Sequence, residues 1–105
     1  MTLVFHPLAE RELIAAAKFY EGHAPGLGAN FIRQVERALA DVVAHPNAGS
    51  LLAGSTVRRR LMQRFPFGVV YEVEAENIAV IAIMHLRRRP GYWKRRVRAE
   101  SHDRG

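Results

Sequence analysis

The densest reactive chemistry of the chain lies in one stretch of nine residues, from position 85 to position 93. It has the sequence HLRRRPGYW and holds an imidazole, three guanidinium groups, a phenol and an indole. Guanidinium groups bind phosphate oxygens through charge-assisted hydrogen bonds, and aromatic rings can stack on unpaired bases. The stretch therefore suits single-stranded nucleic acid, and His85 is its candidate acid or base.

Basic residues gather in the same half of the chain. Positions 57–98 hold eleven Lys or Arg residues and three Glu residues, a net charge of about +8, whereas the other residues sum to about −2. Such an asymmetry creates a positive potential that attracts polyanions or acidic protein segments. The arginines come in runs, whereas a surface kept only for solubility is better served by interspersed charges. We therefore expect an acidic partner.

Each member of the 85–93 stretch also has a plainer structural interpretation. A histidine on a buried strand is more often structural than catalytic, and Trp93 is expected to cap the core. Tyr92 fits either role. The histidines show no paired metal-ligand spacing and the chain has no cysteine, so disulfides and thiolate nucleophiles are excluded. We expect neither a metal nor a cofactor.

Length and composition favour a small globular protein. A chain of 105 residues fits a single domain, which we place at 1–98, followed by a flexible tail at 99–105. No apolar run approaches the ~20 residues that span a bilayer, and the first residues lack the basic start and apolar stretch of a secretory signal. The expected location is the cytoplasm, with no membrane partner.

The hydrophobic pattern predicts an α+β fold. A short strand at 3–5 precedes Pro7, which suits the first turn of a helix, and apolar residues then recur at helical spacing in two segments, about 7–22 and 25–44. Three segments rich in Val, Ile, Phe and Tyr follow at 57–65, 67–75 and 77–85, with short turns between them. We therefore expect two amphipathic helices packed on a four-stranded, mainly antiparallel sheet.

Alternation along the strands assigns side chains to faces. In the 57–65 strand it places Arg58, Arg60, Met62 and Arg64 on one side, which we expect to face solvent, and Arg59 on the other. In the 67–75 strand the residues 67, 69, 71 and 73 should face the helices. Residues 78–84 are apolar on both faces, which favours the centre of the sheet.

Two segments resemble a known family. The runs VRRRLMQRFPFGVVYEVE and IAVIAIMHLRRRPGYWKRR resemble the RelE/ParE superfamily of type II toxin–antitoxin toxins, also called plasmid stabilization proteins. Tyr20 and the run GLGANFIRQVERAL are also similar to that family, so the resemblance covers roughly residues 3–96. It implies two N-terminal helices against an antiparallel sheet, the same order that periodicity predicts.

The resemblance implies one of two mechanisms. RelE-like members are ribosome-dependent, metal-independent mRNA endonucleases, and this pattern would make Arg59, Arg89, His85 and Tyr92 the catalytic residues. ParE-like members instead block DNA gyrase without a known cleavage chemistry. Gly68 stands where the nuclease motif carries an arginine, and Leu61 stands where a second lysine is expected.

Each of these two losses would cost roughly 2 to 4 kcal/mol of transition-state stabilisation. The ParE-like branch is therefore favoured, with growth inhibition through an essential target such as DNA gyrase. An mRNA endonuclease and a degenerate, non-toxic binding module remain as alternatives.

The resemblance also implies a protein partner. Toxins of this kind are neutralised by a cognate antitoxin whose flexible segment wraps the toxin, and an acidic or amphipathic segment would suit the basic strands here. Contact with DNA is expected only through the complex with the antitoxin. The candidate residues for binding the target or the antitoxin are Arg58, Arg60, Arg64, Arg87, Trp93 and Arg95.

Overall fold

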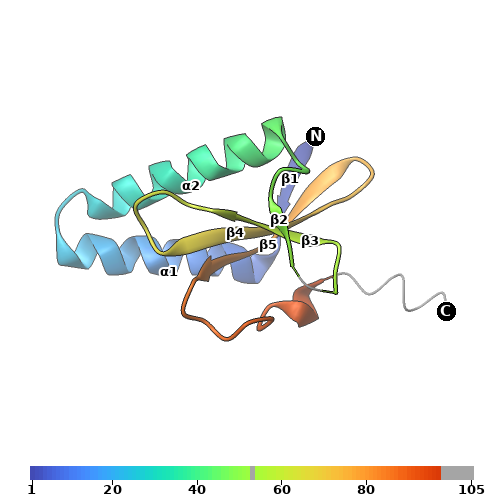
Figure 1. Ribbon diagram of the computed structural model, residues 1–105. Helices are drawn as coiled ribbons and strands as arrows, with labels where there is room; N and C mark the ends of the chain where they lie inside the picture. The colour runs from blue at the N-terminus through green and yellow to red at the C-terminus, as the bar shows by residue number, and fades with distance from the viewer. Residues whose placement is uncertain (53, 98–105) are drawn as a thin grey trace.

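The computed structural model describes residues 1–52 and 54–97, so the tail predicted at 99–105 lies outside the described residues. The helices and strands are labelled in Figure 1. In chain order the elements are β1 (Thr2–Phe5), α1 (Pro7–His23), α2 (Leu27–Ala44), β2 (Ser50–Leu51), β3 (Val57–Leu61), β4 (Phe67–Val73), β5 (Asn77–His85) and the 3-10 helix η1 (Lys94–Arg96).

Both helices lie within two residues of their predicted bounds. The first begins at Pro7, and the side chain of His6 caps it by accepting a hydrogen bond from the Leu8 N–H at 3.0 Å. The second was expected from position 25 but begins at Leu27, because the preceding Gly26 has a φ of 85° and a left-handed backbone. The two helices therefore form an antiparallel pair joined by a short turn.

Within residues 1–52 and 54–97 the sheet has five strands in the order β1-β5-β4-β3-β2, not four as predicted. The additional strand is β2, which pairs antiparallel with β3. Two residues are too few to produce an alternating pattern, so β2 could not be predicted from hydrophobic periodicity. Among the strands of the described residues, only β1 and β5 pair in parallel, and the α+β class is confirmed. The middle strand is β4, whereas β5, which we expected at the centre, lies beside it as an interior strand.

Strand β3 is shorter than predicted. It ends at Leu61 rather than at residue 65, and the chain then turns before β4. Arg64 in this turn has a φ of 72°, a left-handed conformation that interrupts an extended strand. The basic residues of this region are consequently divided between a strand and a turn.

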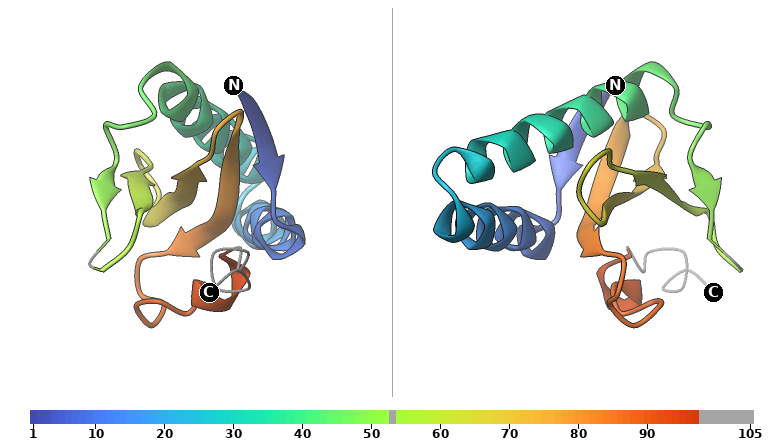
Figure 2. Two further views of the ribbon diagram at one scale, coloured as in Figure 1. Left: turned by 90° about the vertical axis from the view of Figure 1, so that its right-hand side faces the viewer. Right: turned by 60° about the vertical axis from the view of Figure 1, so that its left-hand side comes forward.

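The two helices cover one face of the sheet and enclose the main core, as Figure 2 shows from two further sides. Phe31 and Val35 of α2 meet Val69 of β4 and Ile78 of β5 there, and all four are at most 1% exposed. Tyr71 is fully buried among them, and its hydroxyl donates to the Pro46 carbonyl at 2.8 Å and accepts from the Gly49 N–H at 3.1 Å. The predicted helix-facing side of β4 is thus confirmed.

A second, smaller core occupies the opposite face of the sheet. It consists of Val57, Val70, Ile81, Ala82, Met84 and Trp93. A shift in the β4–β5 register pairs Val70 with Ala82 but Tyr71 with Val80, so Ile81 is an extra residue. This bulge places Ile81 beside Ala82 on the same face. Strand β5 is apolar on both sides because each side packs against one of the two cores.

The segment that follows β5 covers this second core, on the side of the sheet away from α2 (Figure 1). Trp93 belongs to this segment and is 4% exposed, so the prediction that it caps the core is confirmed.

The prediction that the side of β3 carrying Arg58 and Arg60 faces solvent is wrong. Met62 is 8% exposed and belongs to the main core. Arg58 donates to the carbonyl oxygens of Asn47 and Gly49, and Arg60 forms an ion pair of 3.2 Å with Asp41 on α2. This side of β3 therefore faces the helix layer at its rim, where long arginine stems pack while their head groups reach polar partners. Arg59 points to the other face.

Candidate functional site

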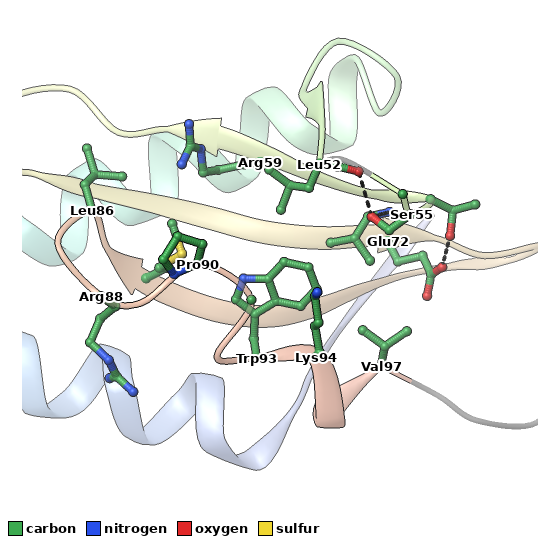
Figure 3. Close-up of a pocket in the computed structure, with 15 residues that line it drawn as sticks. Leu52, Ser55, Arg59, Glu72, Leu86, Arg88, Pro90, Trp93, Lys94 and Val97 are labelled. Atoms are coloured by element: carbon green, nitrogen blue, oxygen red, sulfur yellow. Dashed lines mark hydrogen bonds between the residues drawn. The ribbon is translucent and has the colours of Figure 1, made fainter.

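The face of the sheet that the helices leave uncovered holds an open groove of about 980 Å³ (Figure 3). Strands β3 and β4 form one side, the turn before β3 closes one end, and the segment after β5 forms the other side. Trp93, Met84 and Val57, which belong to the second core, give the groove an apolar floor. Chain segments far apart in sequence thus meet around one hollow.

The groove carries an excess of positive charge. Arg59 and Lys94 line it, against one carboxylate, that of Glu72. The Arg88 stem also borders the groove, but its guanidinium lies over the Tyr92 ring and points toward α1 (Figure 3). The Glu72 carboxylate already accepts a hydrogen bond from the Thr56 hydroxyl. Cations beside an apolar floor form a surface that attracts anionic groups bearing apolar neighbours.

Arg59 occupies the groove because Gly68 has no side chain. A Cβ atom at position 68 would lie 3.0 Å from the Cγ and 3.1 Å from the Cδ of Arg59, closer than ordinary packing allows. The Nε atom of Arg59 is buried and has no hydrogen-bond partner among the described residues. A buried donor without an acceptor is unfavourable by about 1 to 3 kcal/mol, so the packing of the Arg59 stem against Gly68 has an energetic cost.

The segment that follows β5 is held in place by Glu12 of α1. The Glu12 carboxylate accepts hydrogen bonds from the Tyr92 hydroxyl at 2.8 Å and from both terminal nitrogens of Arg96 at 2.9 Å. The Ile83 backbone N–H also donates to it at 3.0 Å. We call Glu12, Tyr92 and Arg96 the Glu12 clamp.

The clamp forms along the part of β5 that β1 no longer pairs with. Strand β1 pairs with β5 only as far as Val80, so the backbone groups beyond that point need other partners. Glu12 satisfies the Ile83 N–H, and Arg96 donates to the Ile81 carbonyl at 3.2 Å. The same side chains that complete the sheet edge therefore fix the segment that carries Trp93.

The clamp keeps Tyr92 protonated. Burial raises the pKa of Tyr92 well above its usual value, and the hydrogen bond to Glu12 raises it further. The hydrogen bond to Glu12 likewise raises the pKa of Arg96. The guanidinium carbons of Arg88 and Arg96 lie 3.8 Å and 5.0 Å from the centre of the Tyr92 ring, so the ring already has two cationic neighbours.

The four residues of the nuclease pattern do not share one hollow. Arg59 lines the groove, whereas His85 lines a separate hollow of about 370 Å³ beside α1. His85 accepts a hydrogen bond from the Arg87 N–H at 3.0 Å through its Nδ1 atom. Tyr92 belongs to the clamp, and Arg89 is exposed and lines neither hollow.

The residues proposed for partner binding are also divided. Trp93 lies in the floor of the groove, whereas Arg58 and Arg60 bond on the other face of β3. The three remaining members are exposed and line neither hollow: Arg64, Arg87 and Arg95.

The sequence did not predict the role of Glu12, which holds the segment after β5 in place. Glu12 was one polar residue among several on the outer side of the first helix, and no pattern marked it as a partner of residues about 80 positions later. Its position next to the apolar stripe, between Ala9 and Ala16, was the one available signal. Arg88, Lys94 and Glu72 were likewise not among the candidates, although all three line the groove.

The described residues were also compared with the requirements of a membrane-spanning helix and of a metal site. Within residues 1–52 and 54–97, no helix has the length and apolar character needed to cross a membrane. The same residues contain no group of three or more His, Asp or Glu side chains that could hold a metal ion.

Comparison with known proteins places the chain in a family. A family model described as the ParE toxin of the type II toxin–antitoxin system parDE matches residues 3–90. A solved structure described as a chromosomal ParDE TA system from P. aeruginosa has the same fold, with a TM-score of 0.73 and 21% identity over 83% of this chain and 97% of that one. No curated protein matches significantly. Since the family model spans most of the chain, the protein belongs to the ParE toxin family of type II toxin–antitoxin systems.

Proposed function

We propose that this protein inhibits growth by binding DNA gyrase and blocking its supercoiling activity, and that a cognate antitoxin neutralises it. Family membership supports the toxin role, since the matching model covers residues 3–90, which include both helices and all of the described strands except Thr2 of β1. The choice of a binding mechanism over a cleavage mechanism depends on the groove, where Arg59 lies against Gly68 without a catalytic partner beside it.

The positions of the nuclease-pattern residues support binding rather than cleavage. Metal-independent cleavage of RNA needs an acid or base within hydrogen-bond reach of the same phosphate that the cations hold. His85 lines a different hollow from Arg59, and the Tyr92 hydroxyl already donates to Glu12. The raised pKa of Tyr92 also makes this phenol a poor base near neutral pH.

The test of this proposal is a supercoiling assay with purified gyrase. We expect the purified protein to inhibit supercoiling at amounts comparable to those of the enzyme. Because a chain with a net charge of +6 can also coat DNA non-specifically, relaxation by a topoisomerase I on the same plasmid is the control. Inhibition of both enzymes, with loss of the effect at moderate salt, would indicate DNA coating.

Full gyrase activity in the presence of excess toxin would overturn the proposed target. Codon-positioned cuts in mRNA on programmed ribosomes would then favour the endonuclease alternative. Normal growth during strong expression of soluble protein would instead favour the non-toxic binding module.

The antitoxin half of the proposal has its own test. It draws on the ParDE description of the structural relative and on the acidic partner expected from the basic segment. Co-expression of the cognate antitoxin should restore growth. A partner that binds only the folded state at a hundred times its Kd stabilises that state by about 2.7 kcal/mol, so the melting temperature should rise by about 10 °C or more. An unchanged melting temperature in a verified complex would contradict this half.

A further inference from the structure

We infer that one end of the sheet, formed by the β3–β4 turn and the turn after β5, binds duplex DNA directly, with the side chains of Arg64, Arg87 and Arg89 on the phosphate backbone. We call these three side chains the basic end. The inference goes beyond the proposed function and does not depend on it, because it assigns the protein a DNA contact of its own, without antitoxin and without gyrase. It replaces the expectation that DNA is contacted only through the antitoxin complex.

The two turns of the basic end lie side by side. The first residue of β4 pairs with the last residue of β5, and the next backbone N–H, that of Leu86, donates to the Pro66 carbonyl at 2.9 Å. Figure 1 shows both turns at the same end of the sheet, where β4 begins and β5 ends. The fold therefore brings Arg64 to the same end as the two other arginines, which come much later in the sequence.

Charge is divided along the length of the sheet. The three arginines are exposed, and their side chains form no ion pair among the described residues. The carboxylates of β4 and of the following turn, Glu72, Glu74 and Glu76, lie toward the other end, because β4 runs from Phe67 to Val73 away from the basic end. A sheet that is positive at one end and negative at the other orients a polyanion toward the arginines.

The backbone of Arg64 supplies an independent observation. Its φ of 72° is left-handed, a conformation that glycine adopts freely and that residues with a side chain rarely adopt. Residues held in such conformations cluster at functional sites. The β3–β4 turn thus presents a guanidinium group to solvent at a position where glycine would be less strained.

The aromatic rings of the described residues favour a duplex over a single strand as the ligand. Single strands bind by stacking their bases on exposed rings, whereas a duplex is held mainly through its phosphates. Trp93 is 4% exposed, and two guanidinium groups flank the Tyr92 ring. The Phe19 ring is exposed but packs against the His23 ring, with centres 4.4 Å apart.

The position of the basic end also favours DNA over a peptide. Its three arginines line neither the groove nor the hollow beside α1. A flexible peptide is recognised by pockets that accept its side chains, whereas phosphate contacts need only cations spread over a surface. The basic end is therefore a site separate from the groove on the uncovered face.

A salt titration of the full-length protein tests the inference. Fluorescence anisotropy gives the affinity for a labelled duplex of about 20 base pairs and for an oligothymidylate of the same length, and we expect the duplex to bind more tightly. Each phosphate contact contributes about −0.9 to the slope of log K against log salt concentration. Three contacts predict a slope of about −2.7, which is a loss of affinity of about 40-fold between ~50 and ~200 mM salt.

Single substitutions locate the contacts. Arg64→Gly, Arg87→Gln and Arg89→Gln should each make the slope shallower by about 0.9, so that the affinity falls only about 12-fold over the same range. Arg37→Gln is the matched control, because it removes the same charge from an exposed position of α2 and should leave the slope unchanged. Arg64→Gly should also keep or raise the urea midpoint, since glycine relieves the left-handed backbone.

Three results would overturn the inference: no binding of the duplex at ~50 mM salt, tighter binding of the oligothymidylate, or an equal change of slope in Arg37→Gln and the basic-end variants. Basic-end variants that bind DNA like the wild type but no longer inhibit gyrase would also overturn it, and would assign the arginines to a protein contact. The DNA titration contains no gyrase. DNA binding without gyrase inhibition therefore rejects only the proposed target, and gyrase inhibition without DNA binding rejects only this inference.

Discussion

The two faces of the sheet are built for different tasks. The helix-covered face is closed by two long helices and buries large side chains such as Phe31 and Tyr71 completely. The other face is covered only in part, by a short segment that one carboxylate of α1 holds in place, and it keeps a cationic groove open to solvent. The first face therefore supplies most of the stability, whereas the second is free to bind a partner.

The largest expected effect is the loss of an aromatic ring from the helix-covered face. Phe31 is fully buried, and its ring lies between 4.9 and 5.3 Å from the rings of Tyr20, Phe65 and Phe67. Phe31→Ala should lower the free energy of unfolding by about 3 to 5 kcal/mol, measured by urea denaturation. The neighbouring Ile32 is 39% exposed, so Ile32→Ala should cost less than about 1 kcal/mol. Similar losses in the two variants would contradict the assignment of the main core.

The next effect concerns the Glu12 clamp. The side chains of Arg96 and Glu12 are 11% and 16% exposed, so Glu12→Gln leaves a largely buried guanidinium without its counter-ion. The variant should lose about 3 kcal/mol of stability and release the segment that covers the second core. Trp93 emission should then shift to longer wavelength. Glu10→Gln, which alters an exposed residue two positions earlier on α1, is the control. An unshifted Trp93 emission in Glu12→Gln would show that the clamp does not hold the segment.

The same clamp predicts a pH dependence at high pH. Because burial and Glu12 raise the pKa of Tyr92, the folded state holds the phenol proton more tightly than the unfolded chain, whose tyrosines titrate near pH ~10. This contribution to stability is complete below pH ~10 and is lost as the pH rises toward the folded pKa. Urea midpoints measured from pH 8 to pH 11 should fall more steeply for the wild type than for Tyr92→Phe. Parallel curves would contradict the role of this phenol.

Sequence patterns predicted the helix-covered face well. Alternation in β4 correctly sent Val69 and Tyr71 to the helices, and helical spacing placed Phe31 and Val35 on the buried side of α2. These residues belong to long elements in which many apolar positions repeat the same period, so one face is clearly marked. Pro7 in the first turn of α1 and the turn at Gly26 before α2 then set the starts of the two helices to within two residues.

The uncovered face was predicted less well, for physical reasons. Alternation in β3 correctly separated Arg59 from Arg58 and Arg60, but it cannot say which side the helices cover. The two-residue strand β2 left no periodic signal. Glu12 joins residues from opposite ends of the chain, and such a long-range hydrogen bond has no local sequence signature. Binding surfaces made from strand, turn and terminal segment therefore need the three-dimensional arrangement.

The smallest expected effect on stability concerns Gly68, where a side chain would crowd Arg59. It is a buried residue of β4, yet its missing side chain matters only on the groove side, where the Arg59 stem lies. In Gly68→Ala the new Cβ would meet flexible side-chain atoms of Arg59 rather than backbone. The crowding should offset the entropic gain of about 0.4 to 1 kcal/mol that a Gly-to-Ala change brings, so stability should barely change.

Gly22→Ala is the matched control, since nothing lies within 4 Å of a Cβ at that helical position. It should raise stability by up to about 1 kcal/mol, whereas the urea midpoint of Gly68→Ala should stay nearly constant. The difference between the two variants measures how tightly the Arg59 stem packs against β4. An equal gain in both variants would show that the Arg59 side chain moves aside without cost, and that Gly68 does not determine its position.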